Sequence, residues 1–354
     1  MAFLEFKNVR IAGISAGVPK RIISNLEIEN LSKDYDNEAF VELTGVKERR
    51  IDNLTTSDLC IPAAEKLIAD LQWDKNEIDA LFFVSQNADY ILPATACIAQ
   101  DRLGLSKECY AMDIALGCSG WVYGLSSAAS LMVNGDIKKC LLLVGDGKRR
   151  AVYDDPLFGF AGAVTALEYK KGSEGFKFHF GTDGSGYDAI IIPDGGARNR
   201  FSEDSLKMEE IDGREYHRLQ SRMKGMDVFS FGITTAPKSI KQLSNHYGFD
   251  YQNADFFVFH QANMKMNGMI AKKLKLSPEK VPSCMYEFGN TSSASIPLTI
   301  VTQLKNKIEN KSTKFICCGF GVGLSWGTVA FKADTMLISE LVEIDEPKET
   351  ETWV

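Results

Sequence analysis

The chain has 354 residues, of which 45% are hydrophobic and 25% charged, as in an ordinary globular protein. This length corresponds to about two domains or to one large duplicated domain. The formal net charge of −7 argues against nucleic-acid binding, which uses a basic face. The apolar stretches are shorter than the roughly 18 to 20 residues that span a bilayer, and the N-terminus has no secretion signal.

The cysteine pattern indicates the compartment. The spacing of the cysteines is not that of metal ligands, and Cys140, Cys317 and Cys318 lie in apolar, strand-like runs. The eight cysteines are at positions 60, 97, 109, 118, 140, 284, 317 and 318. We therefore expect a reduced, cytoplasmic protein with no zinc site.

The N-terminal part of the chain predicts alternating strands and helices. The first residues alternate like a strand, a surface helix and loop follow, and Thr56, Ser57 and Asp58 cap an amphipathic helix. A buried strand and a helix opened by Pro93 come next. In order, these five expected segments are residues 1–19, 25–46, 56–71, 80–85 and 93–103.

Residues 110–146 form the most informative stretch. The pattern predicts a strand at 110–114, a tight turn at 115–117, a helix at 118–134 closed by Gly135, and a strand at 139–144. The helix is apolar almost all round, and the second strand shows no alternation. Both features favour burial, as in a parallel sheet that is covered on both faces.

Cys118 would open this helix. A thiol in a first helical turn meets unpaired backbone N–H groups and the positive end of the helix dipole, which favour the thiolate. The competing interpretation is that Cys118 packs as a small hydrophobic residue, as most unpaired cysteines do. A catalytic role therefore depends on the rest of the chain.

The chain contains an internal repeat. Residues 82–84 (FFV) match 256–258 (FFV), and 141–145 (LLLVG) match 315–319 (FICCG), with an offset of 174 residues in both cases. The repeat predicts a duplicated α/β unit with halves at 1–174 and 175–332, followed by an acidic C-terminal extension at 333–354 without a clear core pattern.

The repeat also predicts where a site would form. Ligands bind outside the carboxyl ends of strands in such sheets. The loops that would converge on one crevice follow Val84, Ile114, Val258, Tyr286 and Cys318. Residues 194–212 read as a surface excursion.

His260 and Asn290 would face Cys118 in this crevice. His260 directly follows a buried strand in FVFHQAN, whereas His179, His217 and His246 lie in polar or surface contexts. A satisfied core histidine remains an alternative for His260, and a helix cap for Asn290. The glycine-rich strings GFGVG and GTDGSG lack the context of nucleotide-binding motifs.

Four strings carry a family resemblance: GCSGW, FHQAN, GNTSSASIP and GFGVGLSWG, in this order. In them the chain resembles the thiolase superfamily, and most closely β-ketoacyl-acyl-carrier-protein synthase III. The resemblance runs from about Arg10 to Phe331, with TGVKER and TDGS as further matches. It implies an α/β thiolase-like fold, in which duplicated, layered α-β-α-β-α halves are related by a pseudo-twofold.

The resemblance also implies the chemistry. Cys118 matches the acyl-accepting nucleophile, His260 the histidine of HQAN, and Asn290 the asparagine of GNTS. The backbone N–H groups of Cys118 and Val322 would form the oxyanion hole. The implied reaction is a decarboxylative Claisen condensation of an acyl group on Cys118 with a malonyl thioester, without a metal or organic cofactor.

The resemblance suggests substrates and partners as well. The substrates would be an acyl-CoA or acyl-carrier thioester and malonyl acyl carrier protein. Lys265 matches the basic residue at the carrier-protein mouth and shares a helix face with Lys272; a merely solvated face is the alternative. Leu92 matches a residue that reaches across a homodimer into the neighbouring acyl pocket. The residues we assign to the acyl pocket are Leu92, Met226, Phe229 and Phe320.

Some positions depart from the family. Ala39 and Leu43 stand where members that use acetyl-CoA carry a tryptophan and an arginine, and Met226 replaces the usual asparagine. These departures leave open a second function, in which the acyl group passes from Cys118 to an alcohol or amine with His260 as general base. A third interpretation is a non-catalytic partner subunit. It predicts a missing nucleophile, whereas Cys118, His260 and Asn290 are all present in this chain.

Overall fold

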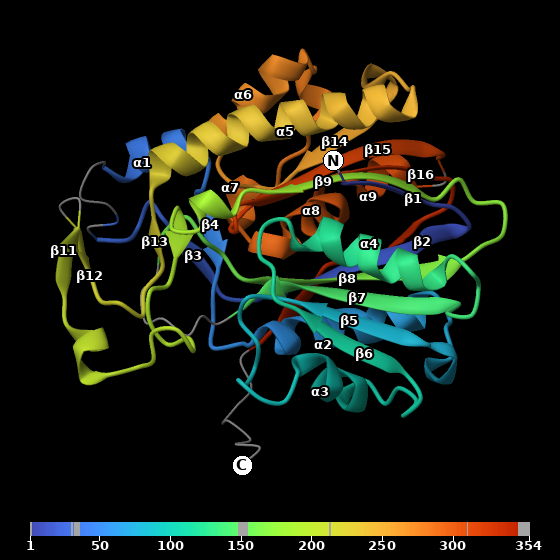
Figure 1. Ribbon diagram of the computed structural model, residues 1–354, viewed down its shortest axis with the longest axis horizontal. Helices are drawn as coiled ribbons and strands as arrows, with labels where there is room; N and C mark the ends of the chain where they lie inside the picture. The colour runs from blue at the N-terminus through green and yellow to red at the C-terminus, as the bar shows by residue number, and fades with distance from the viewer. Residues whose placement is uncertain are drawn as a thin grey trace.

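Helices and two large β-sheets alternate in the order helix, sheet, helix, sheet, helix (Figure 1). The computed structural model describes residues 2–29, 31, 36–147, 155–211, 214–309 and 311–345. One apolar core lies between the sheets and includes the fully buried Trp121. Two further cores are present, one between each sheet and its outer helices. The expected layered α/β architecture is confirmed.

The two sheets repeat one topology. The N-terminal sheet contains β2 (Val9–Pro19), β5 (Ala80–Val84), β6 (Tyr110–Ile114), β7 (Lys139–Asp146) and β8 (Ala161–Tyr169). The C-terminal sheet contains β1 (Ala2–Phe6), β9 (Phe176–Thr182), β14 (Phe256–Phe259), β15 (Thr313–Gly321) and β16 (Ser325–Ala333). Four strands run in the order β2-β8-β7-β5 in one sheet and β9-β16-β15-β14 in the other. The repeat in the sequence therefore reflects a duplicated unit.

The helices cover both faces of each sheet. The outer helices of the N-terminal sheet are α2 (Thr56–Asp70) and α3 (Thr95–Arg102), and those of the C-terminal sheet are α5 (Gly225–Tyr247) and α6 (Met264–Leu274). The helices between the sheets are α4 (Gly120–Met132), α8 (Ser295–Thr299) and α9 (Lys305–Ile308). The sequence explains α2, because Thr55 and Asp58 form a capping box one residue before the expected cap.

The ends of the chain cross between the halves. The expected first strand is two strands, because Asn8 adopts a left-handed φ of 64° and turns the chain from β1 into β2. β1 then joins the sheet of the C-terminal half. From the expected C-terminal extension, β17 (Leu337–Ile338) and β18 (Val342–Ile344) pair in parallel with β2 in the N-terminal sheet. Neither half is thus built from one continuous stretch of sequence.

The second half has no counterpart of β6 among the described residues. The strand expected to end near Tyr286 is instead the short helix α7 (Met285–Phe288). Gly289 follows it with a φ of 64°, a conformation that glycine adopts without steric cost. The chain then turns directly toward the centre of the molecule.

Two small antiparallel strand pairs form in and around the excursion predicted at 194–212. Their strands pair as β10 (Ile190–Ile191) with β13 (Arg222–Met223) and β11 (Glu209–Ile211) with β12 (Arg214–Tyr216). Asp194 accepts hydrogen bonds from Arg218 Nε at 2.9 Å and from Ser205 Oγ at 2.8 Å. The excursion is therefore an ordered part of the fold where the structure describes it.

The remaining elements lie at one end of the molecule, where α1 (Asn37–Thr44) stands near the pair β3 (Ile22–Ser24) and β4 (Glu48–Arg50).

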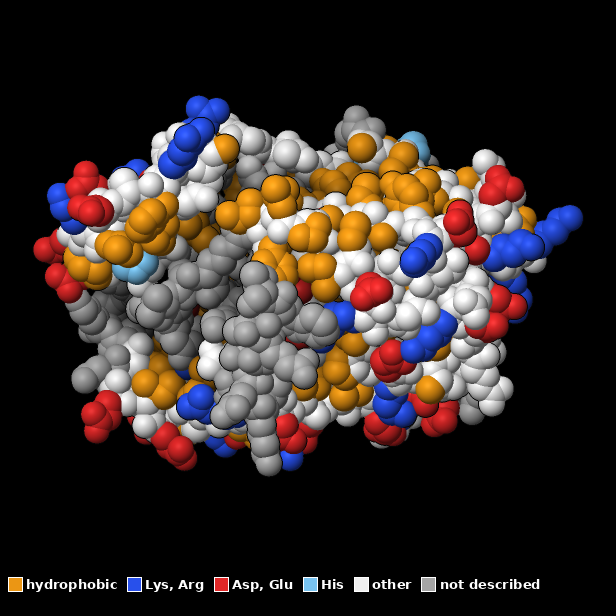
Figure 2. Space-filling model, turned by 90° about the horizontal axis from the view of Figure 1, so that it is seen from below, with side chains coloured by type: hydrophobic (Ala, Val, Ile, Leu, Met, Phe, Trp, Pro, Cys, Tyr) orange, Lys and Arg blue, Asp and Glu red, His pale blue; other side chains and the backbone are white. Residues whose placement is uncertain are grey.

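On the face shown in Figure 2, hydrophobic side chains gather in a band. In the described ranges, no helix has the length and apolar character needed to cross a lipid bilayer.

Candidate active site

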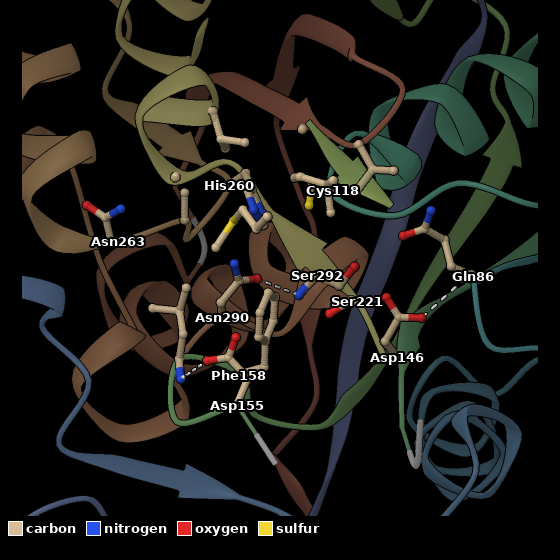
Figure 3. Close-up of a pocket in the computed structure, with 18 of the residues that line it drawn as sticks. Gln86, Cys118, Asp146, Asp155, Phe158, Ser221, His260, Asn263, Asn290 and Ser292 are labelled. Carbon is tan, nitrogen blue, oxygen red and sulfur yellow. Dashed lines mark hydrogen bonds between the residues drawn. The ribbon is translucent and has the colours of Figure 1, made fainter. Parts of the chain in front are cut away.

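A cavity of about 380 Å³ lies at the carboxyl ends of β5, β7, β14 and β15. Cys118, His260 and Asn290 all line it, although they come from different halves of the chain (Figure 3). The structure therefore brings together the three residues that the motifs predicted. The position agrees with the general placement of ligand sites in open α/β sheets.

Cys118 lies in the turn between β6 and α4. Gly120 N–H donates to Gly117 O at 2.7 Å, and the helix begins at Gly120, two residues later than predicted. Cys118 thus precedes the first helical turn and does not belong to it. A β-carbon added to Gly319 would lie 2.8 Å from Cys118 O, and one added to Gly321 would lie 2.8 Å from Cys118 Sγ. These glycines of β15 let the strand approach the cysteine.

The surroundings of Cys118 differ from those of most other cysteines. All eight cysteines are outside disulfide bonds. Burial raises the pKa of Cys284 and of Cys318 to about 12, and burial also raises the pKa of Cys140 and of Cys317. These four side chains remain protonated thiols in the core. Cys118 is only partly buried and lines the cavity.

His260 follows β14, and two hydrogen bonds hold its backbone. The backbone N–H of His260 donates to Cys318 O at 2.9 Å, and Asn267 Nδ2 donates to the backbone oxygen of His260 at 3.1 Å. The imidazole is 2% exposed, and this burial lowers its pKa to about 4, with a partly opposing effect of the Ser292 backbone. His260 is therefore neutral at neutral pH. A neutral imidazole has one N–H to donate.

The environment of His260 Nδ1 indicates which nitrogen carries that proton. Nδ1 lies 2.9 Å from Ser295 Oγ, and Gln261 N–H points to the same Oγ at 3.3 Å. Ser295 Oγ can thus accept from Gln261 and donate its hydroxyl proton to Nδ1. This donation requires the tautomer whose imidazole proton is on Nε2, which we adopt as the catalytic tautomer.

Asn290 is oriented by its own neighbour. Its Oδ1 accepts the backbone N–H of Ser292 at 3.0 Å, at the start of the short 3₁₀ turn Ser292–Ala294. Its backbone N–H donates to Leu157 O at 2.9 Å. The remaining group, the Nδ2 amino group, points into the cavity toward His260 (Figure 3). Asn290 thus orders a local turn and presents a donor at the same time.

Val322 lines the cavity from the turn between β15 and β16. Ser325 Oγ donates to Val322 O at 2.8 Å and lies 2.8 Å from Ser119 Oγ. The turn with Val322 is thereby tied to the residue after Cys118. The backbone N–H groups of Cys118 and Val322 remain our predicted oxyanion donors.

The other predicted pocket residues divide into two groups. Phe229 and Phe320 line the cavity. Met226 does not, and it is 76% exposed. On α5 the cavity is lined by Gly225, Val228 and Phe229, which are three and four residues apart and share a helix face, whereas Met226 lies on a different face.

Leu92 and the two lysines lie on the surface of this chain. Leu92 is 83% exposed and does not line the cavity of its own chain. Lys265 and Lys272 are both exposed on α6. The first turn of that helix contributes Met266 to the cavity wall.

Sequence reasoning missed several polar residues of the cavity wall, among them Gln86, Asn87, Asp146, Asp155 and Ser221. For Gln86, Asn87 and Asp146, the position at the carboxyl ends of β5 and β7 was the available signal. Within the ranges that the structure describes, no group of three or more His, Cys, Asp or Glu side chains is placed to hold a metal ion.

Comparisons with known proteins agree with this site. The family model 3-oxoacyl-[acyl-carrier-protein] synthase III matches residues 112–184, and the model of its C-terminal part matches 245–333. A putative 3-oxoacyl-[acyl-carrier-protein] synthase 3 of Campylobacter jejuni is 34% identical, with 92% of this chain and 94% of the relative covered. A β-ketoacyl-[acyl-carrier-protein] synthase III of Clostridium acetobutylicum is 32% identical, with 92% and 98% covered.

Solved structures give the same result. The crystal structure of a 3-oxoacyl-(acyl-carrier protein) synthase from Burkholderia xenovorans superposes with a TM-score of 0.89 and 36% identity, covering 97% of this chain and 99% of that chain. Together, the relatives, the duplicated fold and the shared cavity show that the chain belongs to the β-ketoacyl-acyl-carrier-protein synthase III family of the thiolase superfamily, which are acyltransferases.

Proposed function

We propose that this protein loads an acyl group onto Cys118 and condenses it with a malonyl thioester by decarboxylative Claisen condensation. The observation that carries this proposal is the convergence of Cys118, His260 and Asn290 on one cavity. A nucleophile, a neutral imidazole and a carboxamide are the groups that the two half-reactions require.

In the first half-reaction the sulfur of Cys118 attacks the carbonyl carbon of an acyl thioester. The carbonyl electrons move onto the oxygen, and the backbone N–H groups of Cys118 and Val322 would stabilise this oxyanion. When the tetrahedral intermediate collapses, the bond to the donor sulfur breaks and the donor thiol leaves. The acyl group is then held as a thioester of Cys118.

In the second half-reaction the malonyl thioester loses carbon dioxide. The electron pair of the broken carbon–carbon bond forms an enolate, whose oxygen would accept hydrogen bonds from His260 Nε2–H and Asn290 Nδ2–H. The enolate carbon attacks the acyl carbonyl, and the Cys118 thiolate leaves. The product is a β-ketoacyl thioester. These side chains and the two substrates complete the reaction, so the proposal assigns no step to a metal or organic cofactor.

Acyl carrier protein is the proposed partner in the cytoplasm. Carrier proteins of this kind are strongly acidic, and the exposed Lys265 and Lys272 lie on α6, which begins at the cavity wall. Basic side chains at the mouth of an otherwise acidic enzyme would steer the carrier to the site.

A homodimer is the proposed assembly. Within the described residues β6 lies at the edge of the N-terminal sheet, with one neighbouring strand. Apolar side chains around this edge are exposed, with Tyr110 at 46%, Ile91 at 84% and Leu92 at 83%. Such a surface is typical of an interface between subunits. In a dimer formed there, Leu92 would enter the acyl pocket of the partner.

The test is a two-stage assay with separated readouts. The protein is first incubated with acyl-CoA and acyl-carrier thioesters, and the Cys118 peptide is analysed by mass spectrometry. Malonyl acyl carrier protein is then added, and carbon dioxide and ketoacyl product are measured. We expect an acyl adduct on Cys118 and then both products, and neither stage in Cys118→Ala. An adduct that passes to an amine or alcohol without carbon dioxide release would instead support simple acyl transfer.

A further inference from the structure

One wall of the cavity is polar in a way that the proposed reaction does not require. Gln86 and Asn87 follow β5, and Asp146 ends the neighbouring parallel strand β7. Figure 3 shows Gln86 and Asp146 on the same side of the cavity, next to Cys118 and opposite His260 and Asn290. The catalytic donors therefore face a separate polar wall across the space that an acyl group would fill.

Asp146 is buried, and its two oxygens have different environments. The side chain is 4% exposed. Oδ1 accepts three hydrogen bonds, from Ser85 Oγ at 2.9 Å, Gln86 N–H at 3.2 Å and Asn87 Nδ2 at 2.9 Å. Oδ2 makes no hydrogen bond to any described residue, and Asp146 lines the cavity. The three donors fix the carboxylate, so Oδ2 is an oriented acceptor.

Gln86 supplies a second group with unused hydrogen-bonding capacity. Its side chain lies against Gly117, where a β-carbon would come within 2.3 Å of Gln86 Oε1. Gly117 directly precedes Cys118, so the carboxamide stands beside the nucleophile. No described residue makes a hydrogen bond to the Gln86 carboxamide; the backbone N–H of Gln86 donates to Asp146 Oδ1.

A purely alkyl acyl group would displace water from this wall and leave both groups without partners. An unpaired buried polar group costs about 1 to 3 kcal/mol, and more when it is charged. A hydroxyl group satisfies the wall, because it can donate to Asp146 Oδ2 and accept from Gln86 Nε2 when the carboxamide, which has no hydrogen bond to a described residue, turns Nε2 in place of Oε1 toward the cavity. An ammonium group has three N–H donors, of which the wall accepts two, through Asp146 Oδ2 and Gln86 Oε1, so one buried N–H would stay unpaired.

We propose that Gln86 and Asp146 are specificity-determining residues that select an acyl chain carrying a hydroxyl group. This inference rests on the proposed acylation of Cys118 and names the substrate class of that step. The acyl donor is therefore a short hydroxyacyl thioester, and the condensation product keeps the hydroxyl group.

The experiment compares the rates at which matched donors acylate Cys118, measured by intact-protein mass spectrometry. The donors are butyryl-CoA, 3-hydroxybutyryl-CoA, 4-hydroxybutyryl-CoA and 3-aminobutyryl-CoA. We expect at least one hydroxyacyl donor to react about tenfold faster than butyryl-CoA, since a site built to pair a hydroxyl discriminates against its absence. Equal rates for hydroxyacyl and butyryl donors, or the fastest rate for the amino donor, would overturn the inference while acylation itself stands.

Two variants test the assigned residues. Gln86→Leu keeps the size of the side chain and removes no hydrogen bond within the described protein, so the hydroxyacyl preference should fall to about threefold or less. Asp146→Asn would keep its oxygen toward the three donors and turn its amino group to the cavity, which removes the acceptor and should abolish the preference.

The matched control is Gln303→Leu, which makes the same replacement outside the cavity and should retain the wild-type preference. Thermal unfolding of each variant separates loss of specificity from loss of fold. A preference that survives in folded Gln86→Leu and Asp146→Asn would contradict the assignment. If no donor acylates Cys118 in the wild type, the proposed function itself fails, which is a different result from equal rates.

Discussion

Gly321 and Cys118 lie in direct contact, so that a β-carbon on Gly321 would stand 2.6 Å from Cβ and 2.8 Å from Sγ of Cys118. Real β-carbons do not approach other atoms so closely. Gly321 ends β15, and Cys118 precedes α4, so this contact joins the two halves at the nucleophile. A residue without a side chain is therefore required beside the sulfur.

The first prediction concerns this contact. Gly321→Ala should displace the Cys118 sulfur, and a displacement of about 1 Å typically lowers a rate about a hundredfold. The rate of Cys118 acylation can be measured by quenching the reaction at a series of times and determining the acylated fraction by intact-protein mass spectrometry. Gly196→Ala is the control, because a β-carbon there meets nothing within 4 Å. Unchanged acylation in Gly321→Ala would show that the strand yields and that the contact does not fix the nucleophile.

The second prediction separates the two half-reactions at Asn290. In Asn290→Asp one oxygen can still accept the Ser292 N–H, but the group that faces the cavity can no longer donate. Loss of one such donor typically lowers a rate by about 10² to 10³. We expect this decrease in carbon dioxide release, with acylation of Cys118 close to wild type. Asn134→Asp, at an exposed position, serves as control. Equal losses in both steps would place Asn290 in acyl loading instead.

The third prediction concerns Ser295 as a positioning residue for His260. Ser295→Ala removes the partner of Nδ1, so the proton is no longer held on Nε2 and the imidazole presents a donor to the cavity less often. Decarboxylation should fall about tenfold or more in kcat, with little change in the KM for the malonyl substrate. Ser130→Ala on the surface of α4 is the control. A loss confined to KM would assign Ser295 to substrate binding.

The sequence was most informative where a residue type and a strand end coincide. Cys118 and His260 were predictable because motifs mark them and because the repeat places their loops at one edge of the sheets, whereas Asn290 was marked by its motif, since the strand expected before it is the helix α7. The duplicated strand order was predictable for the same reason, since two matches at one offset preserve the order of elements.

Other features depend on packing that no local pattern encodes. The chain ends exchange sheets through β1 and β17, which are short and have little periodic signal. Met226 was wrongly expected in the pocket, because its helix begins only at Gly225 and the rotation of that helix decides which side chains face inward. The polar wall with Asp146 emerges only when two parallel strands are placed side by side.

The last prediction concerns pH and two buried histidines. Burial lowers the pKa of both His260 and His179 from an ordinary value of 6.5 to about 4. Between these values the unfolded chain binds protons that the folded protein does not, so the free energy of unfolding should decrease as the pH falls from about 6.5 to about 4. The loss at His260 is no more than about 3 kcal/mol, and stability from this source is complete above pH 6.5.

Urea unfolding at a series of pH values measures this effect. His179 Nδ1 lies 2.7 Å from Ser239 Oγ, away from the cavity residues, so His179→Gln can be studied without the active site. In this variant the free energy of unfolding should depend less steeply on pH below 6.5. Asn134→Gln, at an exposed position and without a titratable group, should keep the wild-type dependence. If the free energy of unfolding depends on pH in the same way in His179→Gln and in the wild type, His179 binds its proton equally well in the folded and unfolded states. Burial then does not control its charge.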